Sequence, residues 1–487
     1  MIKNFKWLLL VSLTFAACNS NDDTADAEVP ITSGTADFSK YVALGDSFAA
    51  GYSDNALFKG GQENAYPNIL AQQFALAGGG DFTTPFMVDN IGGFSMGGSQ
   101  IPQFPTRLYL NTTNNTPANV SGISGTVFTD HLTGPFNNMG IPGAKSFHLV
   151  TPGYGTLNPY FGRFASTATA TVIADATAQS PTFFSLWIGG NDVLGYATSG
   201  GSGVNQTGNL NPATYGSSDI TDPQVFAATY SSLVTSLTAG GAKGVVANLP
   251  YITALPFFTT VPYNPVPLND ATVAQLTAGF TPYNNGLLYA ASVGLLTPAE
   301  AAKRTIAFHA GAGNAVVMVD SYLTNLTAYG IPSYRQATAE DLIVLPARGF
   351  IGTAVGGNPA QINGVSVPLA DNWVLSKEEI AEVKTATDAY NVTIQAVAEA
   401  NGLAFVDTKT ILEQLKTTGI ASDGFTLTSV YVTGGTFSLD GVHPSPRGYA
   451  FIANMFAEAI NTKYGSNLPK VSMGDYRILY PMDSMTF

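Results

Sequence analysis

The chain has 487 residues, with 20 Lys and Arg against 33 Asp and Glu, for a formal net charge of −13. So acidic a chain has few cations to neutralise phosphates, which argues against nucleic acid as a partner. Hydrophobic residues make up 45% of the chain, enough for a large core, so wholesale disorder is excluded. The single cysteine, Cys18, excludes an intrachain disulfide and a cysteine-based metal cluster.

The first 17 residues have the pattern of a secretion signal. Lys3 and Lys6 precede a short apolar run over 7–15, which is too short to remain as a membrane span. Two alanines and Cys18 end this stretch, and the arrangement resembles the lipobox of bacterial lipoproteins, in which the cysteine is acylated. An ordinary signal peptide followed by an incidental cysteine is the alternative.

Residues 18–37 are polar, acidic and without periodicity, so we expect a flexible tether. Acidic residues just after the cysteine also resemble the surface-export signals of Bacteroidetes lipoproteins. No later segment has 18 uninterrupted apolar residues, so the sequence predicts no membrane span. These features predict a lipoprotein of the bacterial envelope, held in the outer membrane by its lipid.

Beyond the tether, short apolar runs alternate with amphipathic helical patterns, which is typical of an α/β fold with a mainly parallel sheet. The sequence predicts strands at 41–44, 183–188, 245–249 and 403–406, and one more at 315–319 within an insertion.

Three helices have clear starting signals. Asp222 and Pro223 open one helix, and Ser376 with Glu379 forms a capping box for a second that ends near 401–402. Ser445 and the proline after it open the last helix, whose apolar residues recur at helical spacing.

Two stretches do not fit a simple alternation of strands and helices. Residues 195–212 are rich in Gly, Ser and Asn and predict a long mobile loop. Residues from 256 to about 372 mix proline-rich segments with helix and strand signals and indicate an insertion. We therefore expect one domain over 38–465, with insertions near 195–220 and 256–372, and a C-terminal extension over 466–487.

A serine and a histidine at opposite ends of the chain carry the strongest chemical signal. Ser47 directly follows the first predicted strand, at the carboxyl edge where α/β sheets place their sites. Asp440 stands three residues before His443, and a carboxylate on the far nitrogen of an imidazole prepares it to act as a base for serine. His443 alone among the four histidines has a carboxylate at this spacing. A capping Asp beside a structural His is the alternative.

Two further turns offer hydrogen-bond donors. Asn191 lies in a Gly-Gly-Asn-Asp turn at 189–192, directly after an apolar strand, and its amide can face a developing oxyanion. Gly143, in the segment 137–144, can offer a backbone N–H to the same oxygen. Both turns are also common structural motifs.

These four blocks, in this order, resemble the SGNH hydrolases, also called the GDSL lipase/esterase superfamily, over residues 38 to about 464. The resemblance implies a three-layer α/β/α, flavodoxin-like fold with a mainly parallel sheet and large insertions. It implies Ser47 as nucleophile, Asp440 and His443 as its partners, and an oxyanion hole from Ser47, Gly143 and Asn191. Phe48 stands where the family name has Leu.

The implied activity is hydrolysis of carboxylic esters through an acyl-serine, without metal or organic cofactor. The ester can be a lipid, an acetylated glycan or a small ester. An inactive, surface-anchored binding protein and an acyltransferase are the alternatives within this fold.

A competing nucleophile is Ser95, which lies in a G-x-S-x-G pattern at 93–97 like that of α/β-hydrolases. That motif requires a strand before the serine and a helix after it. Pro102 and Pro105 exclude a helix there, so a glycine-rich loop is the expected structure.

Overall fold

The computed structural model describes residues 30–482, so the predicted signal peptide and Cys18 lie outside the described residues. A five-stranded parallel sheet has the order β17-β8-β7-β1-β6. This is the flavodoxin-like order, with the first strand between the second and third along the chain. The strands are β1 (Tyr41–Gly45), β6 (Asn138–Gly140), β7 (Phe183–Trp187), β8 (Lys243–Ala247) and β17 (Ala404–Val406).

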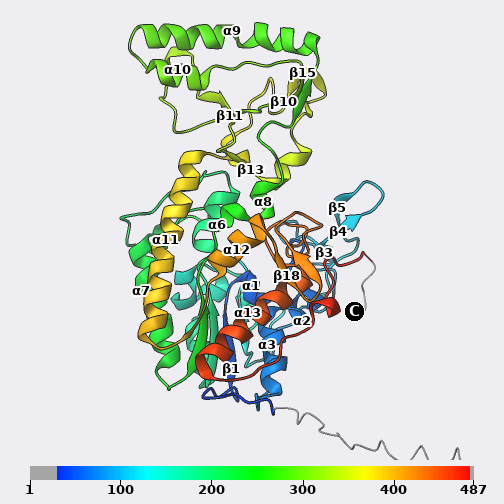
Figure 1. The fold of residues 1–487 in the computed structure, drawn as a ribbon, viewed down its shortest axis with the longest axis vertical. Helices are drawn as coiled ribbons and strands as arrows, with labels where there is room; N and C mark the ends of the chain where they lie inside the picture. Colours follow the sequence, from blue (N-terminus) through cyan, green and yellow to red (C-terminus); the bar gives the residue numbers. More distant parts are fainter. Residues whose placement is uncertain (1–29, 483–487) are drawn as a thin grey trace, which may run out of the picture.

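Helices cover both faces of this sheet (Figure 1). Two helices that pack on each other, α3 (Tyr66–Ala75) and α13 (Pro446–Tyr464), lie on one face. The other face carries α5 (Val172–Thr177), α7 (Pro223–Thr238) and α11 (Lys377–Ala400). Because both faces are covered, β1 and β7 are buried along their whole length, which explains their continuous rather than alternating apolar pattern. The three-layer α/β/α fold predicted from the sequence is therefore confirmed.

Shorter elements complete this body. The helices are α1 (Ser47–Ala50), α2 (Lys59–Glu63), α4 (Pro159–Gly162), α6 (Asn191–Thr198), α8 (Pro256–Thr259) and α12 (Thr408–Thr417). Three antiparallel hairpins are formed by β2 (Ser95–Met96) with β3 (Ser99–Gln100), β4 (Leu108–Asn111) with β5 (Thr116–Asn119), and β18 (Ile420–Ser422) with β19 (Phe425–Leu427).

The predicted loop over 195–212 is partly helix, because α6 continues to Thr198 through Gly195. The remainder is hydrogen-bonded to the body, because Lys145 Nζ donates to the carbonyl of Asp219 and Gly208 N–H donates to Asp222, the cap of α7. The loop also has internal bonds. Asp219 accepts hydrogen bonds from the backbone of Val204 and Gly216 and from the side chain of Gln206. The sequence predicted a mobile loop because its Gly- and Ser-rich composition does not reveal these side-chain-to-backbone hydrogen bonds.

Both ends of the described chain pack on the body. Thr35 N–H donates to the carbonyl of Tyr464, and Phe38 is buried, so residues 30–37 of the expected tether already belong to the folded part. In the C-terminal extension, the Tyr480 hydroxyl donates to the carbonyl of Gly60. No helix within residues 30–482 is long and apolar enough to cross a membrane.

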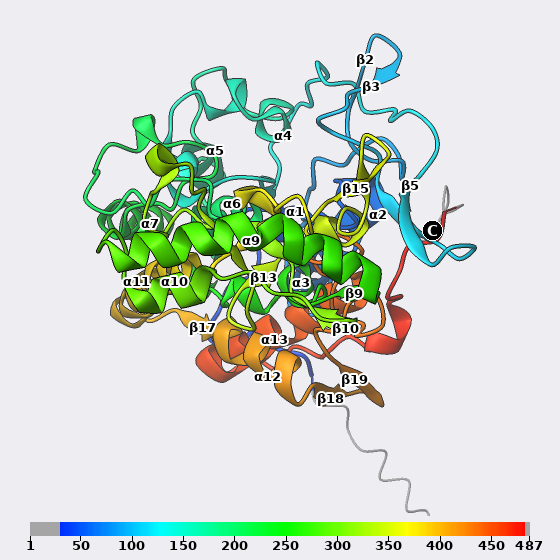
Figure 2. The same cartoon turned by 90° about the horizontal axis from the view of Figure 1, so that it is seen from above.

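The insertion after α8 forms a lobe that rises from the end of the sheet at which β8 finishes (Figure 1). Seen from above, its longest helix crosses over the body (Figure 2). We call residues 261–373 the inserted lobe. Its helices are α9 (Asp270–Ser292) and α10 (Pro298–Arg304). Its strands are β9 (Val266–Leu268), β10 (Gly311–Asn314), β11 (Val317–Val319), β12 (Tyr334–Gln336), β13 (Leu342–Ile343), β14 (Ala354–Val355) and β15 (Asn358–Ile362); β13 pairs with β16 (Val374–Leu375), which leads into α11.

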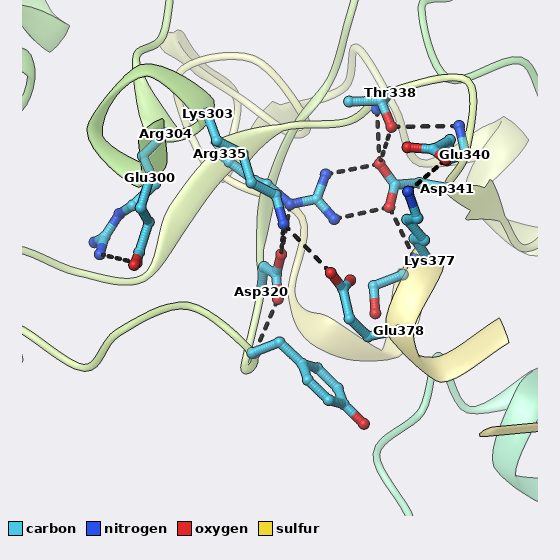
Figure 3. A network of polar contacts seen from close by, with 12 residues as sticks. Glu300, Lys303, Arg304, Asp320, Arg335, Thr338, Glu340, Asp341, Lys377 and Glu378 are labelled. Carbon is cyan, nitrogen blue, oxygen red and sulfur yellow. Dashed lines mark hydrogen bonds and ion pairs between the residues drawn. The ribbon is translucent and has the colours of Figure 1, made fainter. Parts of the chain in front are cut away.

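The base of the lobe joins the main core, whereas its tip has a small core of its own, formed by Leu287, Ala290, Leu296, Ala301, Leu326 and Ile331. The lobe also holds a buried network of charges (Figure 3). Arg335 forms a two-pronged bond with Asp341, at 2.7 Å for each nitrogen, and also contacts Asp320. Asp341 accepts a further hydrogen bond from the backbone N–H of Lys377, the first residue of α11. The network therefore connects the lobe to a helix of the body.

Candidate active site

The register of the sheet brings three loops to one point. Gly45 of β1 pairs with Gly140 of β6 on one side and with Trp187 of β7 on the other. The segments after these residues therefore start side by side at the carboxyl edge of the sheet, and they contain Ser47, Gly143 and Asn191. A Cβ on Gly140 would lie 2.2 Å from the backbone nitrogen of Ala50, so only glycine allows α1 to pack this closely on β6.

Ser47, His443 and Asp440 form a continuous hydrogen-bonded chain. His443 Nε2 lies 2.8 Å from Ser47 Oγ, and His443 Nδ1 lies 2.9 Å from Asp440 Oδ2. Ser47 is the first residue of α1, and His443 comes just before Ser445, which caps α13. The structure thus brings together residues 396 positions apart in the sequence, in the geometry of a serine nucleophile, its base and an orienting carboxylate.

Asp440 is held as an anion by its surroundings. Its Oδ1 accepts the backbone N–H groups of Val442 and His443, each at 2.8 Å, and Oδ2 accepts the N–H of Asn55 besides the imidazole. Burial alone would raise the pKa of this carboxyl, but the charge of His443 and these hydrogen bonds hold the pKa below its ordinary value. The Asp440 carboxylate is therefore held in one position and in its charged form. It lies on the side of the imidazole that faces away from Ser47.

A turn that the sequence did not single out clamps the loop carrying Asp440. Ser53 Oγ donates to the carbonyl of Pro444, and Leu439 N–H donates to Asp54 Oδ1. Asp54 and Asn55 both have positive φ, which Asp and Asn adopt more readily than most residues. This Asp-Asn pair, seven and eight residues after Ser47, was the sequence signal that could have predicted the turn. The turn holds the loop that carries Asp440 against the segment that carries the nucleophile.

Asp54 is itself an unusual group. Its side chain is buried, and its Oδ2 has no hydrogen-bond partner among the described residues. Burial raises the pKa of Asp54 to about 7, and the neighbouring charge of Asp440 acts in the same direction.

Three candidate donors for an oxyanion lie on the segments that follow β1, β6 and β7. Gly143 has φ +79, and its N–H meets no acceptor within residues 30–482. The N–H of Ser47 opens α1, and the first amides of a helix have no partner within it. Asn191 opens α6 and uses one amide hydrogen on the carbonyl of Ala144, at 3.0 Å, which leaves the second for a ligand.

The loop with Gly143 is tied to the helix with Asn191. Asp192, fully buried, accepts both the N–H of Ser146 at 2.8 Å and its hydroxyl at 2.7 Å. Lys145, also buried, donates to the carbonyl of Asp219 at 2.6 Å. Because the two donor segments are joined through these bonds, Gly143 and Asn191 keep a fixed relative position, as an oxyanion hole requires.

A cavity of about 80 Å³ adjoins this centre, with Asp46, Ser47 and Asn191 in its lining. Most of its remaining wall is aliphatic or aromatic. Asp46 caps α1 by accepting the N–H of Phe48, and burial raises the pKa of Asp46 to about 6. The sequence did not indicate this cavity, because its walls come from five separate parts of the chain.

Ser95 has none of these partners. It lies on β2, in a hairpin that returns through Gly97 and Gly98 to β3, and its hydroxyl donates to the carbonyl of Thr126 at 3.4 Å. No helix follows Ser95, so the G-x-S-x-G pattern does not form a nucleophile elbow. Within residues 30–482 no histidine is hydrogen-bonded to it.

The other histidines serve local structure. His131 and His309 contact backbone carbonyls, and His148 accepts the N–H of Lys145. Burial lowers the pKa of His148 to about 4, which keeps it neutral. The described part of the chain contains no group of three or more His, Cys, Asp or Glu residues arranged to hold a metal ion.

No protein-family model matches this chain, and no curated protein sequence does. Solved structures with a similar arrangement include two variants of Axe2, an acetyl-xylooligosaccharide esterase from Geobacillus Stearmophilus. They are 13% and 12% identical, with TM-scores of 0.31 and 0.32, over 91% and 90% of this chain and 100% and 99% of theirs. An extracellular lipase from Streptomyces rimosus is 12% identical with a TM-score of 0.31, over 87% of this chain and 98% of its own. Scores this low carry no argument about activity.

Proposed function

We propose that this protein is a serine esterase of the SGNH superfamily, which hydrolyses carboxylic esters through an acyl-serine intermediate. The observation that carries the proposal is the chain from Ser47 through His443 to Asp440, at 2.8 and 2.9 Å, beside three donors at the same sheet edge. An inactive binding protein would have no need of an intact hydrogen-bonded Ser-His-Asp triad.

The reaction proceeds in two steps. His443 takes the proton of Ser47 as the oxygen attacks the ester carbonyl, and Asp440 stabilises the imidazolium. The N–H groups of Ser47 and Gly143 and the amide of Asn191 hold the negative oxygen. His443 then donates the proton to the leaving alcohol. In the second step His443 takes a proton from water, the water oxygen attacks the acyl carbonyl, and Ser47 leaves with the proton from His443 as the acid is released.

The acyl-enzyme is the species to detect. Mixing enzyme with an excess of p-nitrophenyl ester and quenching with acid should leave one acyl group on the protein, mapped by mass spectrometry to Ser47. Release of p-nitrophenol should show a burst where deacylation is slower than acylation. Turnover without a covalent adduct at Ser47, under conditions in which a burst is seen, would contradict the proposal.

We also propose that the protein is a lipoprotein of the bacterial envelope, anchored through Cys18. The support is the sequence alone: a positive start, a short apolar run and two alanines before the only cysteine. Cys18→Ala should convert a membrane-pelleting, lipid-labelled protein into an unlabelled one. Incorporation of labelled fatty acid by the Cys18→Ala variant, or its absence in the wild type, would refute anchoring while leaving the esterase proposal intact.

A further inference from the structure

The cavity beside Ser47 runs along the carboxyl edge of the sheet. Its lining starts with Ser47 and Asn191, at the ends of β1 and β7, and continues past Leu249, just after β8. It then reaches α12 through Leu412 and Leu415, and α13 through the residues Phe451, Ile452 and Met455. The cavity therefore leads from the nucleophile into the space between two helices.

The chemistry of the wall changes along this path. Polar groups that can take part in the reaction, Ser47 and Asn191, lie at the end next to the triad. Asp46 is the one ionisable side chain among the described residues that line the cavity. The rest of the wall is dominated by Leu, Ile, Val, Phe, Met and Pro. A sugar placed there would lose its water without gaining hydrogen bonds, whereas a hydrocarbon chain would lose nothing.

We propose that this cavity is the acyl site, and that the substrate is an ester of a medium-length, unbranched carboxylic acid. The inference rests on the proposed esterase function and adds the identity of the acyl group. It places the acyl carbonyl between Ser47 and the oxyanion donors, with the hydrocarbon chain between α12 and α13.

The volume sets the length of the chain. A water molecule in the liquid takes up about 30 Å³, and a methylene group takes up about as much. A cavity of 80 Å³ therefore holds at least about three carbon atoms beyond the carbonyl. The best-fitting acid is longer than acetate, which leaves most of the cavity unfilled.

The test is the chain-length profile of kcat/KM, measured with p-nitrophenyl esters from acetate to dodecanoate. Burial should raise kcat/KM by roughly fourfold for each added methylene up to the length that fills the cavity. Beyond that length kcat/KM should fall. A wild-type profile that is highest for acetate would overturn this proposal and leave the esterase function standing, whereas no turnover of any ester would overturn both.

Two variants reshape the cavity in opposite directions. Leu415→Phe narrows it and should move the optimum to shorter chains. Met455→Ala widens it and should move the optimum to longer chains, so the proposal stays testable where one variant does not fold. Glu413→Phe, on the exposed side of α12, is the matched control and should keep the wild-type profile. Identical profiles for all four folded proteins would show that the acyl chain binds elsewhere.

Discussion

The catalytic edge of the sheet and the inserted lobe are held in place by different forces. At the edge, Ser47 and Asn191 open helices, and backbone hydrogen bonds hold Asp440 in the loop before α13. In the lobe, short two-stranded pairings surround a buried arginine that lies between two buried carboxylates. The edge is thus ordered by the secondary structure of the body, and the lobe by a small apolar core together with a few specific charges.

This difference predicts two separable kinds of damage. Substitutions at the edge should abolish activity and leave the fold intact, because the side chains they remove contribute little to the large apolar core. Changes in the charge network should weaken the lobe and leave the chemistry intact at temperatures where it stays folded. The catalytic loop also contacts the segment that leads into the lobe, because the N–H of Phe257, in α8, donates to the carbonyl of Gly441.

The largest effect is expected for His443→Ala. Without its base, Ser47 is not activated, and kcat should fall by about 10⁵–10⁶, with the unfolding temperature little changed. Ser47→Ala should cost about as much, and the double variant no more, because the residues act as one unit. Steady-state kinetics and thermal unfolding of the three variants test this prediction. Additive losses of kcat in the double variant would contradict a triad that acts as one unit.

A large loss of stability is expected for Arg335→Leu. This change leaves Asp320 and Asp341 buried without their partner, which should cost about 3–5 kcal/mol of unfolding free energy. Lys470→Met breaks an exposed pair with Glu458 and should cost less than about 1 kcal/mol. Denaturant unfolding measures both. A normal unfolding midpoint for Arg335→Leu, or a loss of kcat in its folded form, would contradict the separation of the two regions.

Removal of one oxyanion donor should have a smaller effect on activity. Asn191→Ala should lower kcat by about 10²–10³, with little change in KM, because the amide acts mainly on the charge of the transition state. Asn211→Ala, an exposed asparagine elsewhere, should leave kcat unchanged. A near-normal kcat for Asn191→Ala would show that its bond to Ala144 is its whole role.

The smallest effect concerns the pH dependence of stability. The folded protein holds a proton on Asp54 up to a pH of about 7, whereas the unfolded chain releases it near 3.8. Stability from this group is therefore gained as pH falls below 7 and lost as pH rises through 7. On going from pH 8 to pH 5, the protonation of Asp54 should raise the free energy of unfolding by about 3 kcal/mol, because the pH falls roughly two units below the pKa of the folded state.

Asp54→Asn removes this titration, so the wild type should gain stability relative to the variant on going from pH 8 to pH 5. Denaturant unfolding at the two pH values measures the gain. A constant difference between the two proteins would show that Asp54 is ionised in the folded state.

The sequence indicated the body of the fold more fully than the lobe. The strands β1 and β7 are continuous apolar runs of five residues that are buried along their whole length, so composition alone locates them. β6, by contrast, is three residues, Asn138–Gly140, whose strand pairing depends on β1 rather than on their own propensity. The lobe has mostly strands of two to five residues, and pairings so short leave little periodicity to detect.

At the site, residue types and block order indicated Ser47, Asn191, Asp440 and His443 because these carry their chemistry in their side chains. The clamp by Asn55 uses a backbone N–H, and nearly any residue type supplies one. The cavity has walls from segments that approach one another only in the folded chain. Such features depend on tertiary structure and have no local signature.

The most direct test of the account is covalent labelling with a fluorophosphonate, which reacts only with an activated serine. The folded protein should take up one label, and peptide mapping should place it on Ser47, next to His443. Ser47→Ala and His443→Ala should lose the label, whereas Ser95→Ala should keep both label and turnover. A label on Ser95, or none on a folded protein, would contradict the assignment of Ser47 as the nucleophile.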